Sequence, residues 1–228
     1  MAKRVVKKKK LKVGNFLIVL FFMIGLFFAV YLFLQIPIQN ILVLNTEYLN
    51  DDDILELAGV KDYPKFLLLP SKSIEKKILK SPYINKVKVH KKWNFVLEIK
   101  VYENKVLFFD MNNNKYIFSD SSGVANNDLY DFRVPRLLNY VPGKKYQKFV
   151  YGMSKVKKNT LSKISDIEYQ PNDYDKDRFL LYMDDGNMVY LTLTKFKMIN
   201  HYNEVLKQLD NHKGILYLDN GNHFQIKE

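Results

Sequence analysis

The side chains that most often bind metals or transfer protons are few in this chain and poorly spaced for a shared site. There are four histidines, His90, His201, His212 and His223, and the last three are 11 residues apart. The surrounding patterns place these three on a helix, in a loop and on a strand. No aspartate or glutamate stands at a spacing that would complete a ligand set. We therefore interpret them as surface histidines and predict no metal site.

A second candidate for metal binding is the acidic stretch near the middle of the chain. Asp173, Asp175 and Asp177 alternate as the first ligands of a calcium loop do. The sixth position of such a loop would be Arg178 instead of glycine, and the twelfth would be Asp184 instead of glutamate. This pattern favours a solvated loop over a calcium site.

Catalytic motifs are also missing. The sequence contains no phosphate-binding loop, nucleophile elbow, S-x-x-K motif or H-E-x-x-H motif. It has no cysteine, which excludes disulfides and thiolate ligands. We predict no catalytic residue, no cofactor and no enzymatic activity. A cell-wall enzyme is a less favoured alternative, since it would need a cleft with paired acids or an activated nucleophile.

The net charge of +12 first suggests nucleic acid, but its distribution does not. Residues 1–13 contain no acid and carry seven of these charges, on Lys3, Arg4, Lys7, Lys8, Lys9, Lys10 and Lys12. The rest of the excess is spread over a long chain, and no aromatic side chains are interleaved with the basic run. The basic tail therefore indicates contact with anionic lipid, and we predict no nucleic-acid partner.

An apolar segment follows this tail. Residues 16–34 form an uncharged run of 19 residues, which as a helix would span about 28 Å, close to the hydrocarbon core of a bilayer. A cleaved signal peptide would have a shorter apolar core and a small-x-small cleavage site, which residues 35–39 lack. We therefore expect an uncleaved transmembrane helix over 16–35.

The lysines Lys7, Lys8, Lys9, Lys10 and Lys12 determine the expected orientation. No basic residue follows the apolar segment until Lys61, so the excess of positive charge lies on its N-terminal side. Because positive charge is retained in the cytoplasm, we expect residues 1–15 to be a cytoplasmic tail and everything after about residue 36 to lie outside.

Residues 36–103 have the pattern of a small α+β domain. An apolar run at 38–45 predicts a strand. Asn50–Asp53 can cap a helix over 51–58 that stops at Gly59, and Ser71 can cap a second helix that ends at Ser81–Pro82. Period-two alternation on both sides of the turn at 92–94 predicts a β-hairpin. The expected order is therefore β-α-α-β-β.

Residues 104–228 predict a second, strand-rich domain with helices. Strand-like runs are expected at 105–109, 115–118, 134–138, 164–170, 178–184 and 187–193. Helices are expected at 145–158, where Phe149, Met153 and Val156 share one side, and at 195–209, where apolar residues recur every three to four positions. The last segment predicts a hairpin around Asn220–Gly221. The whole chain is therefore expected to be α+β.

This layout resembles the FtsQ/DivIB family of bacterial cell-division proteins. The resembling passages are 43–60, 78–89, 97–103, 120–124 and 134–137. The resemblance implies a POTRA domain at 36–103, a β domain at 104–228 and a cell-membrane protein at the division septum. It departs where Trp93-Asn94 replaces a frequent proline and where Tyr217-Leu218-Asp219 lacks a frequent arginine. A POTRA-bearing module for protein transport or assembly is the alternative.

The resemblance also implies a divisome scaffold whose partners resemble FtsB/DivIC and FtsL, with FtsW- and FtsI-type enzymes downstream. We expect a partner to add a strand to the final hairpin, whose last strand ends close to the chain terminus. The residues expected to contact it are Tyr217, Leu218, Asn220, Phe224 and Ile226. Packing of Phe224 and Ile226 into the core is the alternative interpretation.

Overall fold

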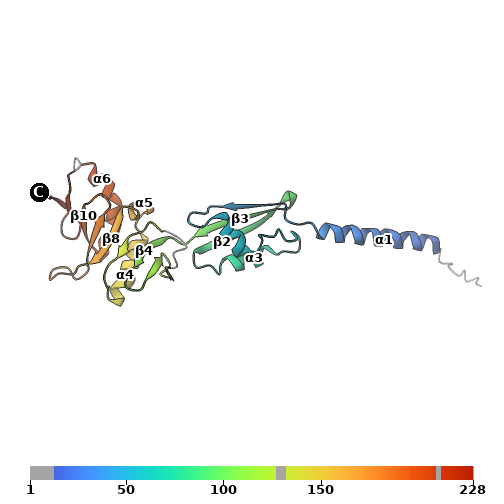
Figure 1. The fold of residues 1–228 in the computed structure, drawn as a ribbon, viewed down its shortest axis with the longest axis horizontal. Helices are drawn as coiled ribbons and strands as arrows, with labels where there is room; N and C mark the ends of the chain where they lie inside the picture. The colour runs from blue at the N-terminus through green and yellow to red at the C-terminus, as the bar shows by residue number, and fades with distance from the viewer. Residues whose placement is uncertain (1–12, 127–131, 209–211, 228) are drawn as a thin grey trace, which may run out of the picture. The chain divides into compact units, whose positions relative to one another are not determined.

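The computed structural model describes residues 13–126, 132–208 and 212–227. The tail lysines expected to set the membrane orientation, Lys7, Lys8, Lys9, Lys10 and Lys12, lie outside the described residues. The chain divides into two compact units (Figure 1). The first unit holds the residues up to Lys80 together with Val87–Val101, and the second holds Ser81–Lys86 together with Tyr102–Glu228.

The first helix, α1 (Val13–Leu34), has the length and composition of a membrane span. Its residues Gly14–Leu34 have a mean hydropathy of 2.9, and their side chains are not buried by the rest of the protein. These 21 residues extend about 31 Å at 1.5 Å each, which matches a hydrocarbon core of about 30 Å. Within the described ranges, α1 is the one helix that could cross a membrane, so the chain fits a single-pass membrane protein.

The elements that follow α1 as far as residue 103, most of whose residues belong to the first unit, have the predicted β-α-α-β-β order, which is confirmed. They are β1 (Asn40–Leu44), α2 (Asp51–Ala58), α3 (Ser71–Ile78), β2 (Ile84–Lys92), the short 3₁₀ turn η1 (Trp93–Phe95) and β3 (Val96–Glu103). The three strands form a sheet in the order β1-β3-β2, with β1 parallel to β3. Ile54 of α2, Ile74 and Ile78 of α3, and Leu97 and Ile99 of β3 are fully buried.

Local signals explain where α2 begins and ends. The Asn50 side chain accepts a hydrogen bond from the Asp53 backbone at 2.8 Å, and the Asp53 carboxylate accepts one from the Asn50 backbone at 3.1 Å. Gly59 closes the helix in the left-handed conformation, with φ of 65°. The acidic run at 51–53 thus starts a helix, as the sequence predicted.

The start of α3 differs from the expectation. Ser71 is the first residue of the helix and not its cap; the cap position is occupied by Pro70, which has no side chain able to bond the first turn. The Pro70 carbonyl instead accepts hydrogen bonds from Ser73 at 3.0 Å and Ile74 at 3.4 Å. Because the proline ring fixes φ near the required extended value, Pro70 can enter the helix without a capping side chain.

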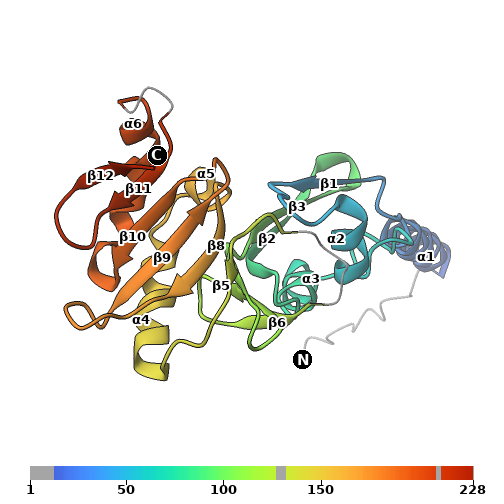
Figure 2. The same ribbon diagram turned by 60° about the vertical axis from the view of Figure 1, so that its left-hand side comes forward.

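The second unit is built on one sheet of nine described strands (Figure 2). The strands are β4 (Val106–Asp110), β5 (Lys115–Phe118), β6 (Gly123–Ala125), β7 (Arg136–Leu137), β8 (Ile164–Tyr169), β9 (Arg178–Met183), β10 (Met188–Thr192), β11 (Gly214–Tyr217) and β12 (His223–Ile226). Their order is β12-β11-β10-β9-β8-β7-β4-β5-β6. The helical segments are α4 (Gly143–Ser154), α5 (Lys158–Leu161), η2 (Leu193–His201) and α6 (Tyr202–Leu206).

The predicted helix over 195–209 is wrong in type. Residues 193–201 form the 3₁₀ helix η2, and only the short α6 that follows it is α-helical. The buried residues Leu193, Phe196, Ile199 and Tyr202 are each three positions apart. A 3₁₀ helix turns once every three residues, so it keeps all four on one face, whereas an α-helix would rotate them away from the core.

The core of the second unit lies between this sheet and the pair α4 and η2. Phe149 of α4 stacks on Phe179 of β9 with ring centroids 4.8 Å apart, and Phe196 of η2 meets both rings edge-on at 5.4 Å. Met153 and Val156 are also buried, although α4 ends before Val156. This core holds β9 and β10, on which the last hairpin is built.

Candidate functional site

The last hairpin, β11 and β12, ends the nine-stranded sheet (Figure 2). β11 runs parallel to β10, and β12 returns antiparallel to β11, with Leu216 opposite Phe224 and Gly214 opposite Ile226. Gly221 has a φ of 86° in the connecting turn, which only glycine adopts readily. In the described part of the chain, β12 has a neighbouring strand on its β11 side only, so its other side is a sheet edge.

The direction of the backbone groups along β12 follows from its pairing. The Lys227 N–H donates to the Lys213 carbonyl at 2.9 Å, so this opposed pair is a hydrogen-bonded one. Hydrogen-bonded and non-hydrogen-bonded pairs alternate in an antiparallel ladder. Residues 223 and 225 therefore also turn their amides toward β11. The N–H and C=O groups of Phe224 and Ile226 point outward from the edge.

The side chains that the sequence singled out are divided between the two faces of the hairpin. Phe224 and Ile226 share the face on which Leu216 is buried. Phe224 packs against the core of the unit, whereas Ile226 is 55% exposed. The two side chains therefore differ: Phe224 lies partly in the core, and Ile226 is open to solvent and free for a partner contact.

Leu218 and Asn220 lie beyond β11. Leu218 is buried in the hydrophobic core, so it supports the hairpin from within and does not present a surface contact. Asn220 is exposed in the turn, where its backbone N–H donates to the Asp219 carboxylate at 2.8 Å. Of the five expected contact residues, Leu218 is therefore the one with no accessible side chain.

Tyr217 belongs to a row of stacked side chains on the opposite face. Its ring lies 5.3 Å from that of Tyr190 on β10 and 4.6 Å from that of His223 on β12, nearly parallel to both. The Arg178 guanidinium of β9 lies 3.4 Å above the Tyr190 ring. The row crosses four neighbouring strands and ends at the sheet edge, where stacking and cation–π attraction stiffen the hairpin.

An ion pair fixes the first residue of this row. The Arg178 Nε lies 2.7 Å from the Asp219 carboxylate, and both side chains are largely buried. Lys195 of η2 donates to the Asp219 backbone carbonyl at 3.1 Å. From the sequence, Arg178 and His223 were considered only for metal binding, and the row that they form with Tyr190 was not predicted, because their proximity depends on strand register. Alternate aromatic residues on successive strands were the only available signal.

A buried asparagine fixes the start of β11. The Asn187 side chain accepts a hydrogen bond from the Gly214 N–H at 2.8 Å and donates to the Tyr202 hydroxyl at 3.0 Å. That hydroxyl donates in turn to Asp185 at 2.8 Å. Burial, and then this hydrogen bond to Asp185, raise the pKa of Tyr202, so the hydroxyl stays protonated. The turn between β9 and β10 is thereby tied to α6 and to the last hairpin.

Gly214 is required where β11 meets β12. A Cβ at this position would lie 2.0 Å from the Gln225 carbonyl oxygen and 2.8 Å from the end of the Phe224 ring. The absence of a side chain lets Phe224 lie across the first residue of β11. This close approach determines how Phe224 sits on the core face of the edge strand.

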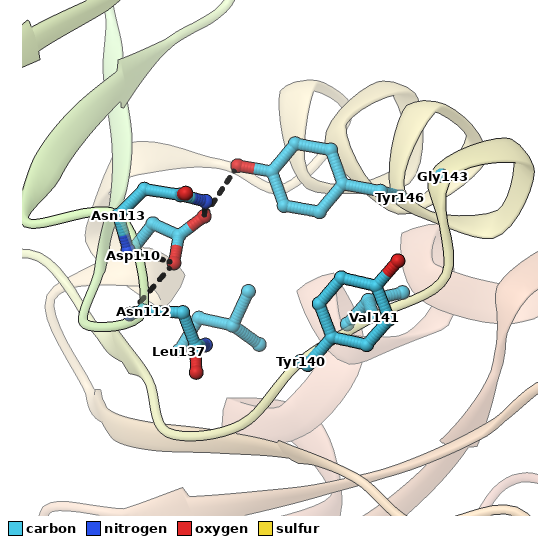
Figure 3. A pocket seen from close by; sticks show the side chains of 8 residues that line it. All are labelled: Asp110, Asn112, Asn113, Leu137, Tyr140, Val141, Gly143 and Tyr146. Atoms are coloured by element: carbon cyan, nitrogen blue, oxygen red, sulfur yellow. Dashed lines mark hydrogen bonds between the residues drawn. The ribbon is translucent and has the colours of Figure 1, made fainter.

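A small cavity at the end of β4 is lined by the buried Asp110 (Figure 3). Asp110 accepts hydrogen bonds from the Asn112 N–H at 3.0 Å, the Asn113 amide at 2.8 Å and the Tyr146 hydroxyl at 2.8 Å. Burial and the hydrogen bond to Asp110 raise the pKa of Tyr146. The arrangement joins the turn after β4 to α4, which is a structural role for both side chains.

The acidic residues between β8 and β9 also have structural contacts. Asn172 accepts hydrogen bonds from the backbones of Tyr174 and Asp175, and Asp177 pairs with Lys145 of α4 at 2.9 Å. Within the ranges that the structure describes, no group of three or more His, Cys, Asp or Glu side chains could hold a metal ion.

The model of one domain family matches part of the chain. It is the POTRA domain of FtsQ type, and it matches residues 36–104. This range includes β1, α2, α3, β2 and β3 of the structure.

Curated relatives match over most of the chain. Cell division protein DivIB of Listeria monocytogenes serovar 1/2a is 25% identical over 225 residues, covering 96% of this chain and 83% of the relative. DivIB of Bacillus subtilis strain 168 is 24% identical, covering 97% and 88%. DivIB of Brevibacillus brevis is 28% identical, covering 89% and 80%.

A solved structure is also similar. It is the major extracytoplasmic domain of the trans isomer of the bacterial cell division protein DivIB from Geobacillus stearothermophilus. The likeness covers 48% of this chain and 96% of that one, at 19% sequence identity and a TM-score of 0.38.

Proposed function

Because the chain belongs to the FtsQ/DivIB family of bacterial cell-division proteins, we propose that it is a membrane-anchored scaffold of the divisome, and not an enzyme. It captures partners resembling FtsB/DivIC and FtsL, and through them FtsW- and FtsI-type enzymes, to support septum formation. The proposed division is a tail at 1–15, a membrane helix at 16–35, a POTRA domain at 36–103 and a β domain at 104–228.

The proposed topology places the tail in the cytoplasm and both folded domains outside, at the division septum. It rests on the basic residues before α1, which are retained on the cytoplasmic side during insertion. The length and hydropathy of α1 support the anchor itself.

One observation carries the partner-binding proposal: the outer edge of β12 presents the backbone groups of Phe224 and Ile226. An extended segment of the partner would pair with these groups and become the next strand of the sheet. Its alternate side chains would meet Ile226 and the outer part of Phe224 on one face, and His223 and Gln225 on the other. Tyr217 and Asn220 stand beside this surface and belong to the proposed contact.

Substitution of Ile226 separates backbone pairing from side-chain contact. Ile226→Pro removes an outward N–H, which the β11–β12 ladder does not use, so the hairpin should keep its fold. Ile226→Ala removes the side chain but keeps the N–H. We expect co-purification of the DivIC-like partner from membranes to fall much further with proline than with alanine.

Two results would contradict this mode of binding. Equal capture by the proline and alanine variants would show that the edge amide is not used. Normal capture after deletion of residues 215–228 would exclude the hairpin as the interface. Circular dichroism and the thermal midpoint of each point variant serve as controls for folding.

A further inference from the structure

The tip of the β2–β3 hairpin carries an exposed tryptophan. Trp93 is 93% exposed, and it is the one tryptophan in the sequence. Tryptophan side chains are on average well buried in soluble proteins, and in membrane proteins they are enriched at the level of the lipid headgroups. An exposed side chain of this size therefore indicates a contact with an apolar surface outside the protein.

The backbone that follows this side chain has an unusual conformation. Asn94 and Phe95, which follow it, both have positive φ values, of 60° and 56°. Asparagine tolerates this conformation, but for phenylalanine it is uncommon and strained, so surrounding contacts must hold it. The Phe95 carbonyl accepts a hydrogen bond from the Gln39 N–H at 3.0 Å, which supplies one such contact.

Aromatic contacts connect the tip to the end of the membrane helix, within the same compact unit. The Phe95 ring lies 6.0 Å from that of Phe33, the second-to-last residue of α1, and 5.6 Å from that of Phe66. The segment between α1 and β1 is also tied down. Ile38 donates to the Pro64 carbonyl at 3.0 Å, and Phe66 donates to the Ile36 carbonyl at 3.0 Å.

These contacts bring Trp93 close to the point where α1 leaves the hydrocarbon. Trp93 and Phe95 are two positions apart, which is at most about 7 Å along an extended chain. The headgroup region adds about 5–7 Å to each side of the hydrocarbon core. Because Phe95 contacts Phe33 at the end of α1, Trp93 can lie in the headgroup layer.

The side chains around the tip suit this depth. Phe33, Phe66, Leu67, Trp93 and Phe95 line a shallow cavity together with Lys91, Lys92 and Asn94. The Lys91 ammonium lies 4.9 Å above the Phe66 ring, and Lys92 pairs with Glu98. Apolar surface next to lysine ammonium groups is typical of side chains that sit between acyl chains and phosphates.

We infer that the hairpin tip, residues 91–95, is a second membrane contact that inserts Trp93 among the lipid headgroups beside α1. With α1 it holds the first unit at two points on the bilayer. The inference uses neither the edge of β12 nor the direction in which α1 crosses the membrane, so its failure would leave the proposed partner binding untouched.

The unmodified protein provides the test, since Trp93 is its only tryptophan. The full chain is placed in nanodiscs of phosphatidylcholine and phosphatidylglycerol, with or without bromine on the acyl chains near the glycerol. We expect the tryptophan emission to be shifted to the blue and to lose intensity with the brominated lipid. It should be protected from acrylamide added to the water.

A matched control moves the tryptophan to a water-exposed position. In the Trp93→Phe background, Tyr174→Trp introduces one tryptophan at a site that is 98% exposed in the second unit. Its emission should be red-shifted and open to acrylamide. The inference is overturned if Trp93 in nanodiscs is as accessible to acrylamide as Trp at position 174 and is not quenched by brominated lipid; a purely protein-binding role for Trp93 would give this result.

Discussion

Single residues decide how the last hairpin is held. Asn187 uses its amide to bond both Gly214 and Tyr202, and Tyr202 extends the chain of hydrogen bonds to Asp185. Arg178 combines its ion pair to Asp219 with stacking on Tyr190. A planar guanidinium is needed for both contacts at once, which a lysine ammonium cannot make.

The Tyr202 hydrogen bond predicts a specific pH dependence of stability. The folded-state pKa of Tyr202 is raised, whereas an unfolded tyrosine titrates near pH 10. Above about pH 10 the unfolded chain loses this proton and the folded chain keeps it, so the group lowers stability as pH rises. The effect is absent below that pH.

We expect the urea midpoint of the wild type to fall more steeply between pH 9 and about pH 11 than that of Tyr202→Phe. At neutral pH this variant should lose about 1–2 kcal/mol of stability, because Asp185 and Asn187 each lose their hydrogen bond to the Tyr202 hydroxyl. Tyr174→Phe, at an exposed position, is the control and should follow the wild type. Parallel curves for wild type and Tyr202→Phe would contradict this account.

At the scale of elements, features that depend on neighbouring residues could be predicted from the sequence, and features that depend on strand register could not. Asn50 and Asp53 identify the start of α2 because a capping box needs only four consecutive residues. The stacked row of Tyr190, Tyr217 and His223 requires the parallel pairing of β10 with β11. That pairing joins strands separated by η2 and α6, and period-two alternation does not determine it.

The spacing of apolar residues also did not predict that residues 193–201 form a 3₁₀ helix. The apolar residues of 195–209 recur every three to four positions, which is the spacing of an α-helix. Only the structure shows that the buried residues are those at spacings of three, which fit a 3₁₀ helix. In the folded chain, Phe196 of η2 lies directly against Gly152 of α4. A Cβ on Gly152 would lie 3.1 Å from the Phe196 Cβ, so α4 and η2 approach very closely.

Removal of the α2 capping box tests whether the Asn50 side chain stabilises this helix. Asn50→Ala leaves the Asp53 N–H without its side-chain acceptor, and we expect a loss of about 1 kcal/mol in the unfolding free energy of this unit. Asn50→Asp keeps an acceptor at the same place and should retain most of that stability. Denaturation followed by far-UV circular dichroism measures both; an unchanged midpoint for Asn50→Ala would contradict the assigned cap.

At the scale of the whole molecule, the chain combines a helix with the length and hydropathy of a membrane span, a POTRA domain and a sheet that has β12 at one of its two described edges. Hydropathy and the order of elements were enough to predict this architecture, since both depend on sequence composition over long segments. The sequence also predicted the final strand as the edge, but which of its amides point outward came from the pairing of β12 with β11. The proposed scaffold function rests on that edge.

Hydrogen exchange of individual amides in β12, with and without the bound DivIC-like partner, tests the central proposal most directly. The amides of Phe224 and Ile226 point outward, so they should exchange quickly in the free protein and become strongly protected in the complex. The amide of Gln225, already turned toward β11, should change little. Unchanged exchange at Phe224 and Ile226 in a saturated complex would contradict strand addition at this edge.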